Sequence, residues 1–112
     1  MKLKIIPEPK FTAEVEITVP GQKELGTLPL TFKYRTHAEY QEWVEGFTIK
    51  TDGEKKEYRT KLDVFPEFVD GWDLDVEFTP ENIKTFLDNY TNAYPEIMQA
   101  YSRLLFESRI KN

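Results

Sequence analysis

Residues 79–106, "TPENIKTFLDNYTNAYPEIMQAYSRLLF", predict two consecutive helices and thereby decide the helical half of the fold. Thr79 is a typical N-cap residue, and Pro80 suits the first helical position because that position leaves its N–H unpaired in any case. The apolar residues that follow at helical spacing form one face of the first helix: Ile83, Phe86, Leu87 and Tyr90.

The second predicted helix begins at Asn92 or at the Tyr94-Pro95 pair. A helix of about 16 residues is roughly 24 Å long, enough to cross a small domain. Its apolar stripe consists of Tyr94, Ile97, Met98, Tyr101, Leu104 and Leu105. The short link between the two helices predicts an antiparallel pair. Phe106 lies outside the stripe, so packing within the pair does not explain it.

The first third of the chain is typical of strands. Residues 11–19, "FTAEVEITV", and 28–35, "LPLTFKYR", alternate apolar and polar side chains with the period of a half-buried strand. Residues 20–27 carry glycine and proline punctuation and predict the loop of a hairpin. Residues 2–8, "KLKIIPE", predict a short additional edge strand.

A helix is predicted after this hairpin. Thr36 and Glu39 form a capping box, and the helix that they open extends to about Glu45. The charged residues 50–57, "KTDGEKKE", predict a mobile surface loop around the turn signal Asp52-Gly53.

The next segment predicts a short helix from about Asp63 to Val69 that ends at Gly71. Pro66 restricts this helix, because proline is tolerated only in a first turn. Residues 72–78, "WDLDVEF", alternate apolar and acidic side chains, which fits a strand or an extended connector packed on the core.

These elements predict one α+β domain over residues 1–112. Residues 1–35 form an N-terminal antiparallel β-hairpin or small sheet, and residues 36–112 form a mainly helical part with three to four helices. The chain has 39% apolar residues and no cysteine, so we expect a folded protein without disulfides or thiolate chemistry. No apolar run approaches the roughly 18 residues of a membrane span. The apolar patch before Pro7 is too short for the core of a signal peptide, so we expect none.

The net charge of −5 is unevenly distributed. Residues 63–88, which we call the acidic belt, contain eight carboxylates and one lysine, so they net −7. This charge disfavours nucleic-acid binding, which requires Lys and Arg to neutralise phosphates. The acidic belt is either an ordinary solvated face or an electrostatic docking surface for a basic partner.

The sequence does not match the residue spacing that known catalytic and metal-binding motifs require. A calcium loop that starts at Asp73 has Phe78 where glycine is required and Lys84 where glutamate is required. The Gly21–Gly26 segment lacks the lysine of a phosphate loop and precedes a strand instead of a helix. His37 is the single histidine, and its place beside a helix cap indicates a surface residue. We therefore expect no enzyme activity, no metal and no cofactor.

The order of short motifs resembles that of the tail assembly chaperones of long-tailed, lambdoid-type bacteriophages. The matching motifs are, in chain order, Gly71-Trp72, Phe78, Leu87 with Tyr90, Ala100-Tyr101 and the terminal "SRIKN". The pattern departs at one point: Thr91 follows the closing tyrosine of the penultimate helix, where the family has proline.

The resemblance implies a non-enzymatic role in the host cell cytoplasm. Such chaperones bind the tape measure protein, help to recruit tail tube subunits around it, and are absent from the finished virion. In many phages, a ribosomal frameshift also yields an extended product that contacts the tube protein. Because a long partner needs many copies to coat it, self-association into a homo-oligomer is a second hypothesis.

The candidate protein-binding residues are Phe106, Arg109, Tyr101, Trp72 and Tyr90. Phe106 and Arg109 lie off the stripe of the last helix, whereas core packing is the simpler interpretation of Tyr101 and Trp72. The alternative function is an acidic regulator that mimics nucleic acid and blocks a basic protein through the acidic belt. A small carboxylate-based enzyme is a third hypothesis, which a defined pocket with paired carboxylates would favour.

Overall fold

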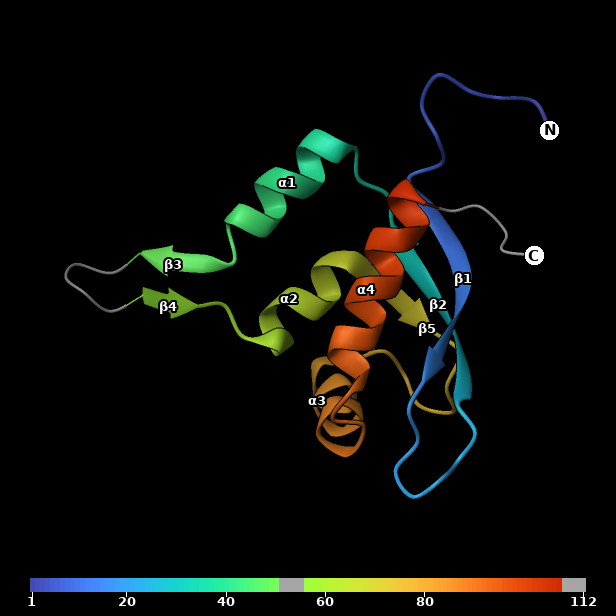
Figure 1. Cartoon of the computed structure of the whole chain (residues 1–112), viewed down its shortest axis with the longest axis vertical. Helices are drawn as coiled ribbons and strands as arrows, with labels where there is room; N and C mark the ends of the chain where they lie inside the picture. The colour runs from blue at the N-terminus through green and yellow to red at the C-terminus, as the bar shows by residue number, and fades with distance from the viewer. Residues whose placement is uncertain (51–55, 108–112) are drawn as a thin grey trace.

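The computed structural model of the chain describes residues 1–50 and 56–107 and shows an α+β fold, as the sequence predicts (Figure 1). A three-stranded antiparallel sheet has the order β1-β2-β5, and a separate two-stranded ribbon pairs β3 with β4. The elements in chain order are β1 (Lys10–Ile17), β2 (Gly26–Lys33), α1 (His37–Glu45), β3 (Thr48–Lys50), β4 (Lys56–Tyr58), α2 (Lys61–Phe68), β5 (Val69–Trp72), α3 (Pro80–Asn89) and α4 (Ala93–Phe106).

The predicted N-terminal hairpin is confirmed. β1 pairs with β2 in an unbroken antiparallel register from Lys10 opposite Lys33 to Ile17 opposite Gly26. Alternation along the strands places one set of side chains under the helices, so that Leu30 and Phe32 are completely buried.

The third strand differs from the prediction. Residues 2–8 do not form an edge strand, because Pro7 and Pro9 remove backbone donors that a ladder next to β1 would need. The third position belongs to β5, which pairs with β2 from Leu30 opposite Trp72 to Phe32 opposite Val69. Its partner β2 lies about forty residues earlier in the chain, so the local sequence pattern does not predict this strand.

The middle helix is longer at its start than predicted and ends earlier. Thr60 caps α2, and its Oγ1 accepts the backbone N–H of Asp63 at 3.2 Å. Pro66 therefore lies inside the helix, where it removes one intrahelical hydrogen bond. The helix ends at Phe68, and the backbone turns directly into β5, so Gly71 belongs to a strand and not to a helix end. Residues 73–78 form a connector that bends at residues 74–76, and only Trp72 of the segment 72–78 is in a strand.

The charged segment after α1 is not wholly a loop. Lys50 and Lys56 belong to β3 and β4 and pair with each other across the ribbon. The ribbon takes its hydrogen bonds from the backbone, so a charged composition does not exclude it. Residues 51–55, where the loop and its Asp-Gly turn were predicted, lie outside the described residues.

The helices α2, α3 and α4 pack with the sheet around one hydrophobic core. Figure 1 shows α3 nearly along its own axis while α4 runs across the picture, so the two helices cross steeply and the predicted antiparallel pair is wrong. The link from Tyr90 to Asn92 is short. However, α3 and α4 pack on different surfaces of α2 and the sheet, so they do not pack along each other. The buried residues are Val15, Ile17, Leu28, Leu30, Phe32, Val64, Phe65, Phe68, Val69, Ile83, Leu87, Ala93, Ile97, Ala100 and Tyr101.

Candidate protein-binding groove

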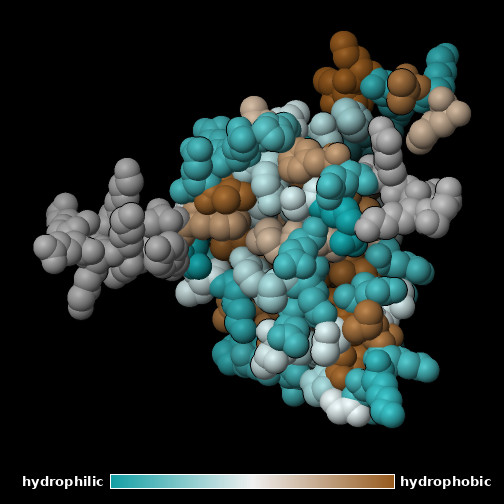
Figure 2. Space-filling view, in the orientation of Figure 1, coloured by the Kyte–Doolittle hydropathy of each residue, from teal (hydrophilic) through white to brown (hydrophobic). Residues whose placement is uncertain are grey.

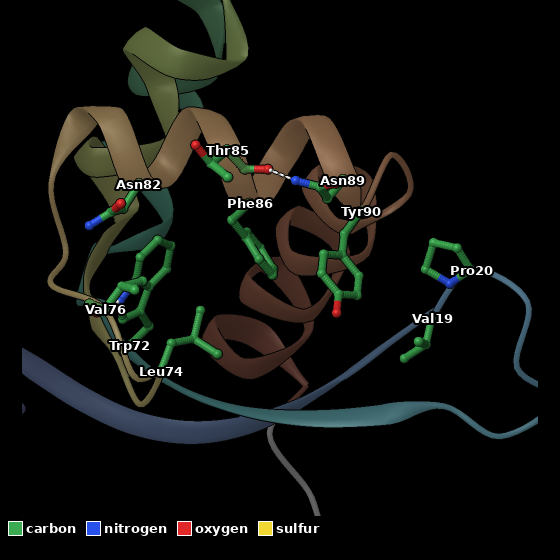
Figure 3. Close-up of a pocket in the computed structure, with 10 residues that line it drawn as sticks. All are labelled: Val19, Pro20, Trp72, Leu74, Val76, Asn82, Thr85, Phe86, Asn89 and Tyr90. Atoms are coloured by element: carbon green, nitrogen blue, oxygen red, sulfur yellow. Dashed lines mark hydrogen bonds between the residues drawn. The ribbon is translucent and has the colours of Figure 1, made fainter.

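An open groove of about 530 Å³ lies between α3, the connector 73–78 and the end of the first strand. Figure 3 shows α3 along the top, with Phe86 and Tyr90 pointing into the space, the connector residues at one end and Val19 and Pro20 at the other. The residues that line it are Val19, Pro20, Trp72, Leu74, Val76, Asn82, Thr85, Phe86, Asn89 and Tyr90. We call this set the groove.

Hydrogen bonds hold the connector in a tight loop. The indole Nε1–H of Trp72 donates to the backbone oxygen of Val76 at 2.8 Å, and the N–H of Asp73 donates to the carbonyl oxygen of Pro29 at 3.2 Å. The loop leaves no room for Leu74 and Val76 in the core, so these side chains are 40% and 50% exposed. The connector thus presents apolar side chains to solvent from a fixed backbone.

The helix side of the groove is fixed by its N-terminus. Thr79 Oγ1 accepts the N–H of Asn82 at 3.2 Å, and the Asn82 amide donates to the carbonyl oxygen of Glu77 at 2.8 Å. The helix buries Ile83 and Leu87 in the core, and Phe86 and Tyr90 on the flank of the same face are half-buried, with their rings stacked at a centroid distance of 5.1 Å. Aromatic side chains of this kind give a large contact area to a partner.

The edge of the groove is acidic. Asp73, Asp75 and Glu77 alternate with the two apolar residues of the connector, and all three are exposed. Within the described part of the chain, none of these carboxylates forms an ion pair. We call these three residues the acidic rim.

The remainder of the acidic belt is largely neutralised. Glu67 pairs with Arg59, Asp70 with Lys10 and Asp88 with Lys84. The hydrogen bond from Lys10 lowers the pKa of the Asp70 carboxyl, and the bond from Lys84 does the same for Asp88. Among the described residues, five carboxylates of the belt form no ion pair, and the acidic rim contributes three of them, next to one another in the chain; Asp63 and Glu81 are the other two.

Comparison with known protein families identifies the family of the whole chain. The model for phage tail assembly chaperones matches residues 1–112. The chain belongs to this family. No curated protein and no solved structure matches the chain. Membership in a chaperone family favours a non-enzymatic role, and its partners are proteins of tail assembly.

The described part of the chaperone has neither a cluster of metal-binding side chains nor a helix that could span a membrane. Within residues 1–50 and 56–107, no cluster of three or more His, Cys, Asp or Glu side chains could hold a metal ion. No helix in the same residues is long and apolar enough to cross a membrane.

The predicted binding residues of the chaperone fall into separate places. Trp72 and Tyr90 come together in the groove, on either side of Phe86, and the rings of Trp72 and Phe86 meet edge-on at 5.6 Å. Tyr101 is completely buried, which confirms the core-packing interpretation. Arg109 lies outside the described residues.

The hydroxyl of Tyr101 has two partners inside the protein. It donates to the carbonyl oxygen of Lys33 at 2.6 Å and accepts a hydrogen bond from Arg35 Nη1 at 3.0 Å. Burial raises the pKa of Tyr101, so the hydroxyl stays protonated over the normal pH range. This residue joins α4 to the end of β2 and is not available to a partner.

Phe106 has a packing role that the sequence did not reveal. Its ring meets Tyr40 edge-on at a centroid distance of 5.1 Å and His37 at 5.2 Å. It therefore links the end of α4 to α1, although its side chain is still 40% exposed. The sequence stripe of α4 missed this contact because α1, not α3, covers that end of the helix.

Helix α1 is held by a polar cluster, since none of its residues is fully buried. The indole N–H of Trp43 donates to Glu67 Oε1 at 2.8 Å, and Arg59 Nη1 donates to the same oxygen at 2.8 Å. The Arg35 guanidinium lies 4.2 Å from the centroid of the Trp43 ring. The hydrogen bond from Arg59, assisted by that from Trp43, lowers the pKa of Glu67.

The groove residues that sequence reasoning missed are chiefly Leu74, Val76 and Phe86. The alternation in residues 72–78 was visible, but it fits a half-buried strand equally well. Phe86 shares the helical spacing of the core residues, so its outward position depends on how α3 is rotated on the core.

Proposed function

We propose that the chaperone binds the tape measure protein by taking an apolar helical segment of that protein into the groove. The observation that carries the proposal is a fixed apolar surface with an acidic rim in a chain of the tail assembly chaperone family. A helix that lies in a groove is a common mode of recognition for amphipathic segments.

The composition of the groove supports this type of partner. Leu74, Val76 and Trp72 offer apolar contact from one side, and Phe86 and Tyr90 offer it from the other. A tape measure protein consists mostly of long amphipathic helices, whose apolar stripe is exposed until the tail tube encloses it. The acidic rim favours segments in which lysine or arginine flanks that stripe.

The wider role follows from the same proposal. By covering the tape measure protein in the host cytoplasm, the chaperone prevents its aggregation until tube subunits assemble around it, and it leaves before the virion is complete. A frameshifted longer form would add the contact to the tail tube protein.

The test is co-purification of the tape measure protein with tagged chaperone at low and at moderate salt. Wild-type chaperone is expected to retain the tape measure protein at both salt concentrations, because apolar contacts dominate. The groove variant L74S/V76S is expected to lose it. The matched control is Leu25→Ser, which changes a leucine that is 52% exposed outside the groove and should retain the partner.

Two results would contradict the proposal. Retention by the groove variant would place the binding surface elsewhere. Recovery of only basic, nucleic-acid-binding proteins, lost as salt rises, would favour the acidic-mimic alternative, because charge contacts between exposed groups are screened by salt.

A further inference from the structure

The residues before the sheet are unusually apolar for an exposed segment. Residues 1–9, which we call the N-terminal arm, include Leu3, Ile5 and Ile6, whose side chains are 90%, 100% and 73% exposed. Figure 1 shows the arm leaving the body of the molecule, and Figure 2 shows hydrophobic side chains standing out at the same place. The fold of one copy makes no use of these side chains.

We propose that, when the tape measure protein does not occupy the groove, the N-terminal arm of one copy docks in the groove of a second copy. Among the residues whose burial the structure describes, the arm and the groove each expose neighbouring large apolar side chains: Leu3, Ile5 and Ile6 in the arm, and Leu74 and Val76 in the groove. Docking the arm of one copy in the groove of another would bury the exposed apolar side chains of both.

The charges of the two surfaces are complementary. Lys2 and Lys4 flank Leu3 in the arm, whereas the acidic rim flanks Leu74 and Val76. In an extended segment, Leu3 and Ile5 point to the same side and lie about 7 Å apart. That spacing lets both enter one open groove, while Lys2 and Lys4 point to the opposite side of the segment and add positive charge close to the acidic rim.

The contacts of the arm within its own copy are weak. Lys4 forms an ion pair with Glu8, but both side chains are 67% exposed, and such surface pairs contribute little. The carbonyl oxygen of Pro9 accepts the N–H of Tyr34 at 2.9 Å, but Pro7 and Pro9 lack backbone donors, so the residues before Pro9 do not continue the ladder. The arm is therefore free to dock without breaking a stable structure.

Geometry favours a second copy over the same copy. The arm is attached at Lys10, whereas the groove begins at Val19, at the other end of β1. The eight residues of β1 span roughly 26 Å, and nine extended residues reach at most about 30 Å. An arm that folded back along its own strand could bring Leu3 to the part of the groove near Trp72, which lies level with Ala13, but not along the groove to Val19.

The proposed contact joins unlike surfaces. Its donor and acceptor lie at opposite ends of the sheet, so each copy can give its arm to one neighbour and accept the arm of another. Such a heterologous contact forms open chains or rings instead of closed dimers.

The experiment measures the mass of the chaperone alone, by light scattering and sedimentation velocity over a range of concentrations at low salt. It needs no partner, so its outcome is independent of the proposed binding of the tape measure protein. The average mass of the wild-type protein in solution is expected to rise well above the 13.3 kDa of one chain as concentration increases. The arm variant L3S/I5S and the groove variant L74S/V76S should each remain monomeric, and Leu25→Ser should associate like the wild type.

Mixing the two variants gives the sharpest result. The arm variant keeps an intact groove and the groove variant keeps an intact arm, so an equimolar mixture can form one contact per pair. The mixture is expected to reach twice the mass of one chain and no more. A monomeric wild type, an arm variant that associates normally, or a mixture that stays monomeric would overturn the proposal. Circular dichroism establishes that both variants are folded.

Discussion

The chaperone contains two aromatic clusters of similar composition and opposite exposure. In the closed cluster, Tyr101 packs on Phe32 and Phe68 at centroid distances of 5.5 and 5.1 Å. In the groove, Phe86 packs on Tyr90 and Trp72 at 5.1 and 5.6 Å. The spacing of the rings is the same in both places.

The difference lies in what covers the rings. The sheet, α2 and α1 enclose the closed cluster, and the Tyr101 hydroxyl finds partners in Lys33 and Arg35. The groove cluster is bordered by α3, the connector and the residues after β1, and no further described element covers it, so its rings remain partly exposed. Aromatic content therefore does not distinguish a core from a binding surface, whereas the number of covering elements does.

The largest effect is expected from Phe68→Ala in the closed cluster. Phe68 is completely buried, so its truncation leaves a cavity and should lower the free energy of unfolding by about 3–5 kcal/mol. Urea denaturation measures this loss. Phe86→Ala is the matched change in the groove cluster and should cost clearly less. Equal losses would erase the distinction between the two clusters.

A smaller effect is expected from Tyr101→Phe. The variant keeps the ring but leaves the Lys33 carbonyl oxygen without its donor, which should cost about 1–3 kcal/mol. Tyr90→Phe removes the corresponding hydroxyl from the groove cluster and should change stability by less than about 0.5 kcal/mol. Thermal unfolding of the two variants compares them directly, and a neutral Tyr101→Phe would show that the buried hydroxyl is not needed.

The acid stability of the protein should depend in part on Glu67. Its pKa is lowered in the folded state, so its contribution is complete above the pKa of the unfolded side chain and is lost as pH falls through the folded pKa. Glu67→Gln should therefore be less stable than wild type at pH 7, by less than about 1 kcal/mol for a partly exposed pair. Urea denaturation from pH 7 to pH 3 should show this difference shrinking, and a constant difference would contradict the role of the charge.

The smallest effect on stability is expected in the groove itself. L74S/V76S changes exposed side chains, so the free energy of unfolding should stay within about 0.5 kcal/mol per site of the wild-type value. The same variant is expected to lose partner binding, which separates a surface role from a structural one. A strongly destabilised variant in urea denaturation would mean that the connector supports the core.

The sequence predicted the elements that depend on local patterns. The hairpin, α1 and α3 follow from alternation and from caps at Thr36 and Thr79, and the structure confirms them. The errors concern contacts between distant segments. β5 forms because β2 has an edge with which it can pair. Phe106 is partly covered because α1 lies next to the C-terminal end of α4.

The groove could be predicted only in fragments. Trp72 and Tyr90 were candidates, but Leu74, Val76 and Phe86 have the spacing of core residues, and only the tertiary arrangement turns them outward. The acidic belt was visible as a total charge, yet its division into paired carboxylates and an acidic rim depends on Lys10 and Arg59, which lie outside the belt in sequence.

The pairing of β5 with β2 also sets the order in which the molecule can be built. The hairpin β1–β2 needs only the first third of the chain, but Trp72 takes its place only when β5 joins β2, and Phe86 and Tyr90 come later still. Contacts between distant segments form slowly because they require a large loop to close. A chain still emerging from the ribosome can thus form the hairpin before the groove, and the surface that we propose for the partner is complete only when nearly all of the helices have been synthesised.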